Sequence, residues 1–260
     1  MPITSSTGDS PTRPEPGSAA SQRHWLAGRT ALVTGASRGI GAATAQAIAA
    51  AGAHVVLAAR DAGALAEVAA QIRAAGGQAT PVPADVSKSA DVARLFTTTA
   101  PAGPVSALVC AAAVLRSVPF AETTEQVWQE TIGVNLTGSF LCCREAFTAM
   151  RAAGGGGRIV TIASLSGVYA TEKFPGLAAY NVSKYGIVGL TEAIAVEGRP
   201  HGISAICLSP GAVDTQMLRE ANPELRPGLT PADVAAIIVA LLDSPLAPAS
   251  GANIPLFSNA

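Results

Sequence analysis

From Arg29 onward, the chain alternates short apolar runs with longer stretches rich in alanine and leucine. The short runs lack strict polar–apolar alternation, which is typical of strands buried on both faces. Strands that alternate with helices need crossover connections, so this pattern predicts a doubly wound, parallel α/β sheet with helices on both faces. The predicted strands are Ala31–Thr34, His54–Ala58, Ala79–Pro83, Ala107–Cys110, Arg158–Ile162 and Ser204–Leu208.

The intervening stretches have helical periodicity. In the first of them, Ile40, Ala43, Ala47 and Ile48 fall on one stripe. In the last, Thr230 stands directly before a proline, which predicts an N-cap followed by proline at the first helical position. The predicted helices are Gly39–Ala51, Asp91–Thr99, Glu125–Asn135, Leu136–Arg151, Ala179–Glu197 and Pro231–Leu242.

Composition bounds the class of protein. The chain has 260 residues, of which 49% are apolar, which is enough for one large core. Its formal net charge is -1, so nothing indicates a nucleic acid or an anionic membrane as a partner. The most apolar long stretch, 42–59, is interrupted by Gln46, Gly52 and His54, and predicts a helix, a turn and a strand rather than a membrane span.

The start of the chain differs from the rest. It is rich in Ser, Thr, Pro, Gly and Ala without periodicity, which predicts a disordered tail over 1–24 and one folded domain over 25–260. It lacks an apolar segment after a basic start, so it does not read as a secretory signal.

The cysteines and histidines follow no metal-ligand spacing, and we expect no metal. Cys110, Cys142, Cys143 and Cys207 sit among apolar residues, so we interpret them as buried free thiols. Free thiols indicate a reducing, cytoplasmic compartment.

The first predicted strand runs through a glycine-rich turn directly into a helix, in the segment 34–41. Gly35, Gly39 and Gly41 let the backbone approach a pyrophosphate, and the helix N-terminus offers free N–H groups. The spacing differs from the common dinucleotide fingerprint, which has two residues between its last glycines. The alternative is a plain strand–helix turn.

The second predicted strand ends where a ribose-reading residue belongs. An acid there binds the 2′-hydroxyl of NAD, whereas this chain has Arg60, which Arg38 can join, and both favour NADP(H) over NAD(H). Asp61 is a contrary sign that we interpret as a solvated side chain. Asp85, after the third strand, either accepts a hydrogen bond from the adenine amino group or caps the next helix.

Tyr180 and Lys184 are four residues apart, about one helical turn, so both side chains lie on one face. A phenol is a poor acid–base catalyst at neutral pH, but a nearby ammonium lowers its pKa. The pair is therefore a candidate proton donor and acceptor.

Together these segments resemble the single-domain short-chain dehydrogenases/reductases over roughly 26–255. Thr-Gly-x-x-x-Gly-Ile-Gly at 34–41 is similar to the cofactor motif of that family, and Tyr180-x-x-x-Lys184 is similar to its catalytic pair. Ser164 and Asn135 fall where its catalytic serine and its relay asparagine fall. The resemblance implies a Rossmann-type sheet of about seven strands, the last within 250–255.

The resemblance also implies the site. The expected catalytic residues are Asn135, Ser164, Tyr180 and Lys184. Ser166 is a rival to the serine, although it would alternate to the other side if the strand continued. The expected cofactor-binding residues are Gly35, Ser37, Arg38, Gly39, Ile40, Gly41, Arg60, Asp85, Val86, Ala112, Tyr180, Lys184, Pro210, Gly211, Val213 and Thr215.

Two segments depart from the family pattern. Cys110-Ala111-Ala112-Ala113 replaces the usual Asn-Asn-Ala-Gly, which predicts altered local hydrogen bonding rather than altered chemistry. The end, 256–260, lacks the usual closing glycines. Substrate identity is expected to depend on two variable segments, 168–177 and 212–228, with an apolar pocket that includes Met217 and Leu218. The alternative for the second segment is a surface lid helix.

The resemblance implies an NADPH-dependent reductase of a small ketone or β-ketoacyl compound, and a homotetramer or dimer formed through the two long helices. Carrier-protein reductases dock an acidic carrier on basic residues, of which only Arg151, Arg158 and Arg199 remain near the corresponding places. The alternatives are such a 3-oxoacyl-[acyl-carrier-protein] reductase, an NAD-dependent alcohol or sugar dehydrogenase, and a non-catalytic nicotinamide-binding regulator.

Overall fold

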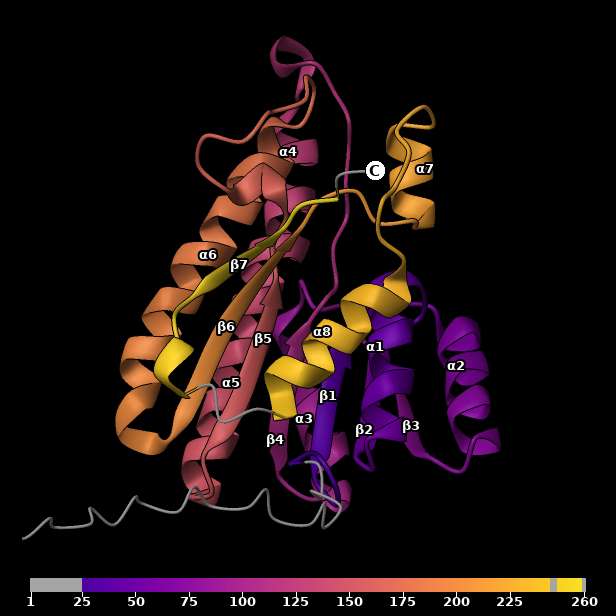
Figure 1. Cartoon of the computed structure of the whole chain (residues 1–260), viewed down its shortest axis with the longest axis vertical. Helices are drawn as coiled ribbons and strands as arrows, with labels where there is room; N and C mark the ends of the chain where they lie inside the picture. The colour runs from indigo at the N-terminus through magenta and orange to yellow at the C-terminus, as the bar shows by residue number, and fades with distance from the viewer. Residues whose placement is uncertain (1–24, 244–246, 259–260) are drawn as a thin grey trace, which may run out of the picture.

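The computed structural model describes residues 25–243 and 247–258. Seven parallel strands form one sheet in the order β3-β2-β1-β4-β5-β6-β7, with helices on both sides (Figure 1). The prediction of a doubly wound α/β sheet is therefore confirmed. The expected tail over 1–24 lies outside the described residues.

The strands are short and mostly buried, and their registers follow a simple parallel ladder. At the centre, Leu32 pairs with Val56 on one side and with Leu108 on the other. The strands are β1 Thr30–Thr34, β2 His54–Ala59, β3 Gln78–Pro83, β4 Val105–Cys110, β5 Gly157–Ile162, β6 Ile203–Pro210 and β7 Asn253–Leu256.

The helices run between the strands, and short 3-10 turns lie at 100–102, 120–122, 165–167, 199–201 and 247–249. A π-helical turn, Gly133–Thr137, joins two of the helices end to end. The α-helices are α1 Gly39–Ala50, α2 Ala62–Ala74, α3 Ser89–Thr99, α4 Glu125–Ile132, α5 Gly138–Ala153, α6 Ala178–Gly198, α7 Gln216–Ala221 and α8 Pro231–Asp243.

Two apolar cores lie on the two faces of the sheet. Helices α1, α2 and α8 cover one face, where Ile48, Leu65 and Ile238 are buried. Helices α3, α5 and α6 cover the other, where Leu95 and Ala146 are among the buried side chains. Figure 1 shows α7 apart from both layers, beyond the carboxyl ends of the strands.

The predicted elements agree with the structure except at three places. All six predicted strands occur, and the Thr230 hydroxyl accepts a hydrogen bond from the Asp233 amide, so it caps α8 as predicted. Helix α2 was not predicted. Helix α7 was expected only as the alternative, a surface lid helix. The predicted helices Glu125–Asn135 and Leu136–Arg151 have the wrong boundary, since the π-helical turn lies across it.

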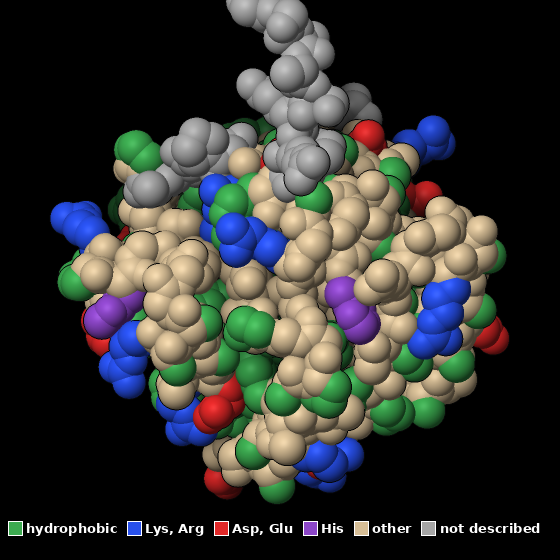
Figure 2. All heavy atoms as spheres, turned by 90° about the horizontal axis from the view of Figure 1, so that it is seen from below, with side chains coloured by type: hydrophobic (Ala, Val, Ile, Leu, Met, Phe, Trp, Pro, Cys, Tyr) green, Lys and Arg blue, Asp and Glu red, His purple; other side chains and the backbone are tan. Residues whose placement is uncertain are grey.

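The face of the molecule at the amino ends of the strands has no patch of a single charge among its described residues. Figure 2 shows this edge, where basic, acidic and hydrophobic side chains are scattered. The Trp25 ring lies against two guanidinium groups, those of Arg29 and Arg158, at 4.2 and 4.1 Å. Among the described residues, no helix has the length and apolarity needed to span a membrane.

The chain runs outward from β1 to β2 and β3 on one side of the sheet, and from β4 to β5, β6 and β7 on the other. The connections that follow β1 and β4 both leave from the carboxyl edge of the sheet. Adjacent crossovers that leave in opposite directions open a crevice, which is where open α/β sheets bind ligands.

Candidate active site

A cavity of about 1270 Å³ lies at this edge of the sheet. Each predicted cofactor-binding residue lines it, from Gly35 on the first turn to Thr215 before α7. Ser164, Tyr180 and Lys184 line it as well, whereas Asn135 does not. The sequence therefore predicted the lining of one continuous cavity from segments far apart in the chain.

The turn after β1 has no room for a side chain at two of its three glycines. A Cβ at Gly35 would lie 2.8 Å from the Ala111 carbonyl oxygen, and one at Gly41 would lie 2.2 Å from the oxygen of Gly35. Gly35 and Gly39 also have positive φ values, 68° and 55°. The turn thus presents bare backbone and the N-terminus of α1 to the cavity, which suits a pyrophosphate.

At the adenosine end, two exposed cations reach the cavity. Arg60 follows β2, and Arg38 donates to the Gln216 side chain across the cleft at 3.0 Å. The Asp61 carboxylate accepts from the Ala64 amide at 3.0 Å and so caps α2 rather than staying merely solvated as predicted. Asp85 accepts from the amide and hydroxyl of Ser87 and does not cap α3, whose N-cap is Lys88.

The segment after β6 closes the other end of the cleft. The Ser258 hydroxyl accepts from the Ala212 amide at 2.8 Å, and Gly211 donates its amide to the Leu256 oxygen at 2.9 Å. The unusual chain end, which lacks the closing glycines, therefore anchors the predicted nicotinamide-contacting turn through a serine.

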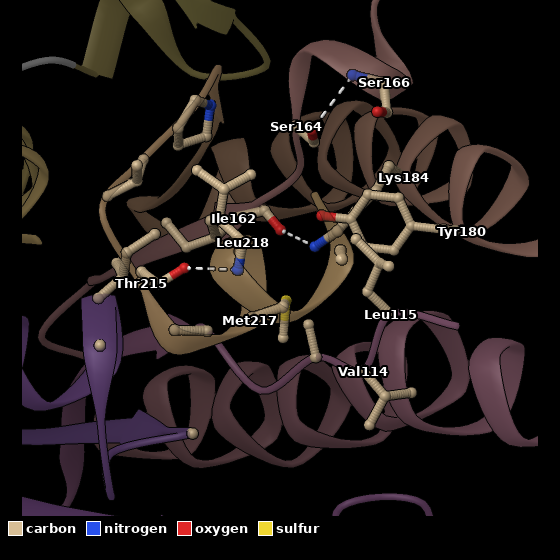
Figure 3. Close-up of a pocket in the computed structure, with 18 of the residues that line it drawn as sticks. Val114, Leu115, Ile162, Ser164, Ser166, Tyr180, Lys184, Thr215, Met217 and Leu218 are labelled. Atoms are coloured by element: carbon tan, nitrogen blue, oxygen red, sulfur yellow. Dashed lines mark hydrogen bonds between the residues drawn. The ribbon is translucent and has the colours of Figure 1, made fainter. Parts of the chain in front are cut away.

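Tyr180 and Ser164 meet at the inner end of the cavity. Figure 3 shows the Tyr180 hydroxyl pointing into the space between Ser164 and Lys184, and the phenol shares a hydrogen bond with Ser164. The Ser164 oxygen also accepts from the Ser166 amide at 3.1 Å. Ser166 lies in the 3-10 turn that follows β5 and binds Ser164 through its backbone amide.

Lys184 is 3% exposed, and its ammonium donates to the Ile162 carbonyl at 2.8 Å. Burial lowers the pKa of Lys184 to about 8, although the thiols of Cys207 and Cys110 oppose the shift. The ammonium lies 5.4 Å from the centre of the Tyr180 ring. The hydrogen bond to Ile162 at the end of β5 thus holds the Lys184 ammonium next to the Tyr180 ring.

The expected effect of Lys184 on Tyr180 is wrong in this structure. Burial raises the pKa of Tyr180 to about 12, and the only opposing influence is the hydrogen bond with Ser164. The physical reason is that desolvation of the phenol outweighs a lysine that is itself desolvated and turned toward Ile162. Tyr180 is therefore fully protonated at neutral pH.

Asn135 lies in the π-helical turn and is fully buried. Its side chain donates to the Val114 oxygen at 3.0 Å and to the Ser183 hydroxyl at 3.1 Å, and accepts from the Val114 amide at 2.8 Å. Ser183 in turn donates to the Tyr180 carbonyl at 2.7 Å. The side chain thus ties α6 to the segment after β4, while the predicted water relay stays a prediction.

The altered segment after β4 keeps its place through β1. The Thr34 hydroxyl accepts from the amides of Ala111 and Ala112, both at 3.2 Å. Cys110 points to the other side, where its sulfur lies 3.7 Å from that of Cys143. Backbone amides thus bind a threonine hydroxyl here, while the expected change in local hydrogen bonding stays a prediction.

The part of the cavity next to Tyr180 is apolar. Met217 and Leu218 were expected there, and Figure 3 places Met217 and Leu115 on the side of the pocket opposite Ser164. Val114 and Leu115, which follow β4, were not predicted. The sequence gives little indication of these two residues, because only their position shortly after the end of a strand points to the cavity. Within the described residues, no group of three or more His, Cys, Asp and Glu side chains could hold a metal.

The chain belongs to the short-chain dehydrogenase family, whose model matches residues 29–226. It is therefore an NAD(P)-dependent oxidoreductase that acts on CH–OH or C=O groups. The fold, the glycine turn and the Tyr–Lys pair agree with that membership.

Curated relatives have different substrates. The chain is 36% identical over 201 residues to a 3-oxoacyl-[acyl-carrier-protein] reductase of Synechocystis sp., covering 76% of this chain and 80% of that one. It is 34% identical over 197 residues to a D-threitol dehydrogenase of Mycolicibacterium smegmatis, covering 75% and 74%.

A solved structure supports the same fold. It is that of a protein from Beutenbergia cavernae assigned as an NAD(P)-dependent gluconate 5-dehydrogenase, with NADP bound at low occupancy. The TM-score is 0.82 at 35% identity, and the match covers 90% of this chain and 96% of that one.

Proposed function

We propose that the protein is an NADPH-dependent reductase that interconverts a carbonyl and a secondary alcohol, with Tyr180 as proton donor and acceptor. The observation that carries this proposal is the meeting of Tyr180, Ser164 and Lys184 at the inner end of a cavity whose other end is the glycine turn. The same chemistry in reverse would oxidise the alcohol.

The roles follow from the contacts. Reduction of a carbonyl needs a proton at the oxygen, and Tyr180 is protonated at neutral pH because its pKa is about 12. The Ser164 hydroxyl donates a hydrogen bond to the carbonyl oxygen of the substrate and holds that oxygen near the phenol. Lys184 stabilises the phenolate left after transfer and is placed to bind a ribose. When bound, the nicotinamide cofactor supplies the hydride.

The preference for NADP(H) is supported by the charges at the adenosine end. Arg60 and Arg38 are exposed cations that line the cavity, while the carboxylate of Asp61 is engaged as the cap of α2. A 2′-phosphate would thus meet two guanidinium groups and no free acid from this segment.

The apolar pocket favours a ketone with apolar neighbours, or a β-ketoacyl compound, over a polyol. Val114, Leu115, Leu177, Met217 and Leu218 offer no hydrogen-bond partners from their side chains. A sugar or polyol would find no hydrogen-bond partner on these five side chains, and each hydroxyl left unpaired costs about 1–3 kcal/mol. A carrier-bound substrate fits less well, since few basic residues stand at the expected docking places.

The protein is further proposed to work in a reducing, cytoplasmic compartment and to self-associate. Four buried free thiols support a reducing, cytoplasmic compartment. Exposed apolar side chains on α6 support self-association.

The test is loss of NADPH absorbance with a β-ketoester, a β-ketoacyl thioester, a cyclic ketone and a ketose, each repeated with NADH. We expect turnover of the first three with NADPH and little with the ketose. Turnover of the ketose alone would support the sugar dehydrogenase. Cofactor binding without turnover of any substrate, in either direction, would support the non-catalytic regulator.

A further inference from the structure

The loop between β5 and α6 carries Ser164 at one end and forms one wall of the pocket. It contains Ala170, which has a φ of 59° and is the one non-glycine with positive φ among the described residues. Such a backbone conformation is unfavourable for a residue with a side chain and persists only where surrounding contacts impose it. The loop must therefore be held by specific interactions.

Lys173 supplies those interactions. Its ammonium donates to the Val168 carbonyl at 2.6 Å, to the Leu165 carbonyl at 3.2 Å and to the Thr171 hydroxyl at 2.5 Å. An ammonium has three N–H donors, so each finds an acceptor within this one loop. Charge-assisted bonds of this kind are about twice as strong as neutral ones.

Tyr185 on α6 fixes the same cluster from the helix side. Its hydroxyl donates to the Val168 carbonyl at 3.0 Å, and its ring centre lies 5.3 Å from the Lys173 ammonium. Tyr185 was expected only to pack. Instead, it joins the loop to the helix that carries Tyr180.

The cluster is coupled to the catalytic serine through the 3-10 turn Leu165–Gly167. Ser164 is tied to the middle and to the last residue of this turn, since its hydroxyl accepts from the Ser166 amide and its carbonyl accepts from the Gly167 amide at 2.8 Å. Gly167 packs on the backbone of Lys184, where a Cβ would lie 2.6 Å from the carbonyl. A lysine that holds Leu165 therefore holds the turn between Ser164 and Lys184.

We propose that Lys173 is a positioning residue that fixes the turn after Ser164, and with it one wall of the substrate pocket. The proposal rests on the proposed function, because it takes Ser164 to act beside Tyr180. Lys173 itself does not line the cavity, so its effect reaches the substrate only through its neighbours.

The test compares Lys173→Met, which keeps the chain length and removes the three donors, with Lys88→Met at an exposed lysine as the control. Active sites are counted by NADPH fluorescence titration. We expect kcat per titrated site to fall roughly tenfold to a hundredfold and the substrate KM to rise several-fold, since small misplacements have effects of this size. The dissociation constant for NADPH should stay within about twofold, because the glycine turn lies elsewhere.

A merely structural lysine would lower the number of titrated sites and leave kcat per site and KM unchanged, which would overturn the proposal. Tyr185→Phe removes one hydroxyl from the same cluster and leaves the ring, so it should show the same split to a smaller degree if Lys173→Met fails to fold. Unchanged constants in a folded Tyr185→Phe protein would then overturn it.

A second measurement separates this proposal from the proposed function. Amide hydrogen exchange over 165–173 should quicken in Lys173→Met and not in Lys88→Met, whether or not a substrate is known. Absence of any turnover by the unmodified protein would contradict the proposed function, whereas unchanged exchange in Lys173→Met would contradict the anchoring.

Discussion

At the scale of single residues, burial shifts the pKa values of two neighbouring groups in opposite directions, upward for Tyr180 and downward for Lys184. Burial raises the pKa of Tyr180 to about 12, which keeps the phenol protonated at neutral pH but makes it a weaker acid than a free tyrosine. Burial also makes the charged form of Lys184 costly, with a pKa of about 8. The buried ammonium therefore lowers the stability of the fold at neutral pH.

Replacing that lysine should stabilise the fold. Lys184 is charged in both folded and unfolded states below pH 8, and its lowered pKa means that folding then carries the cost of burying the charge. We expect Lys184→Met to raise the free energy of unfolding by up to about 3 kcal/mol at pH 7 while abolishing turnover. Urea unfolding measures this.

The sign of the pH dependence provides a control. As pH rises from about 8 to 10.5, the folded lysine loses its proton before the unfolded one, so the stability of the unmodified protein increases relative to the variant. The advantage of Lys184→Met should therefore shrink over this range. An advantage that is absent at pH 7, or that grows above pH 8, would contradict the burial cost.

Arg60 is the residue that we expect to decide the cofactor preference. A charge-assisted contact with the 2′-phosphate is worth roughly 1.5–3 kcal/mol, so we expect NADPH to be preferred by about one to two decades in kcat/KM. Arg60→Asp should abolish or reverse that preference, and Arg199→Asp, at an exposed arginine on the far edge of the sheet, should leave it unchanged. Equal kcat/KM for NADPH and NADH in the unmodified protein would refute the assignment.

At the scale of elements, the turn between β1 and α1 tolerates no side chain at its last glycine. A Cβ at Gly41 would lie 2.2 Å from the Gly35 oxygen, so Gly41→Ala must displace the turn. Overpacking costs about 1–3 kcal/mol, and we expect NADPH affinity to fall about 5- to 150-fold. Gly63→Ala, at an exposed glycine on α2, is the matched control. Fluorescence titration with equal affinities for both variants would count against this turn as the phosphate site.

The elements were predictable where their signal is local. Buried runs such as Leu32–Thr34 mark the strands, and helix α2 could have been found, since Leu65, Val68, Ala69 and Ile72 are its buried stripe. The π-helical turn could not, because long-range bonds of Asn135 accompany it rather than any local propensity.

The site was predictable to a similar degree. Motif spacing brought the cofactor residues to one cavity, and each of them lines it. Two features depend on the folded loops instead. The ammonium of Lys173 finds its acceptors only once the loop after β5 is closed, and burial reverses the expected pKa shift of Tyr180.

At the scale of the whole molecule, α6 has an apolar face that the described residues leave open. Val182, Tyr185 and Val196 are 46%, 40% and 69% exposed, and a Cβ added at Gly189 would meet no other atom within 4 Å. These positions follow one another at helical spacing and form a stripe. Gly186, in contrast, is covered by Leu136 of the same chain, so only part of the helix needs a partner.

An exposed stripe of this kind favours symmetric self-association. We expect light scattering to give the mass of a dimer or tetramer at micromolar concentration, and Gly189→Arg to shift it to a monomer by placing a charge in the contact. Gly63→Arg on α2 should leave the mass unchanged. A monomer mass for the unmodified protein would contradict the expected assembly.

The central claim is that Tyr180 donates the proton in an NADPH-dependent reduction. The most direct test is Tyr180→Phe, which removes the phenol oxygen and keeps the ring. We predict that NADPH binds with unchanged affinity by fluorescence titration, while turnover of a substrate accepted by the unmodified enzyme falls by roughly 10²–10⁴-fold. A near-normal rate in the Tyr180→Phe protein would show that another group is the acid.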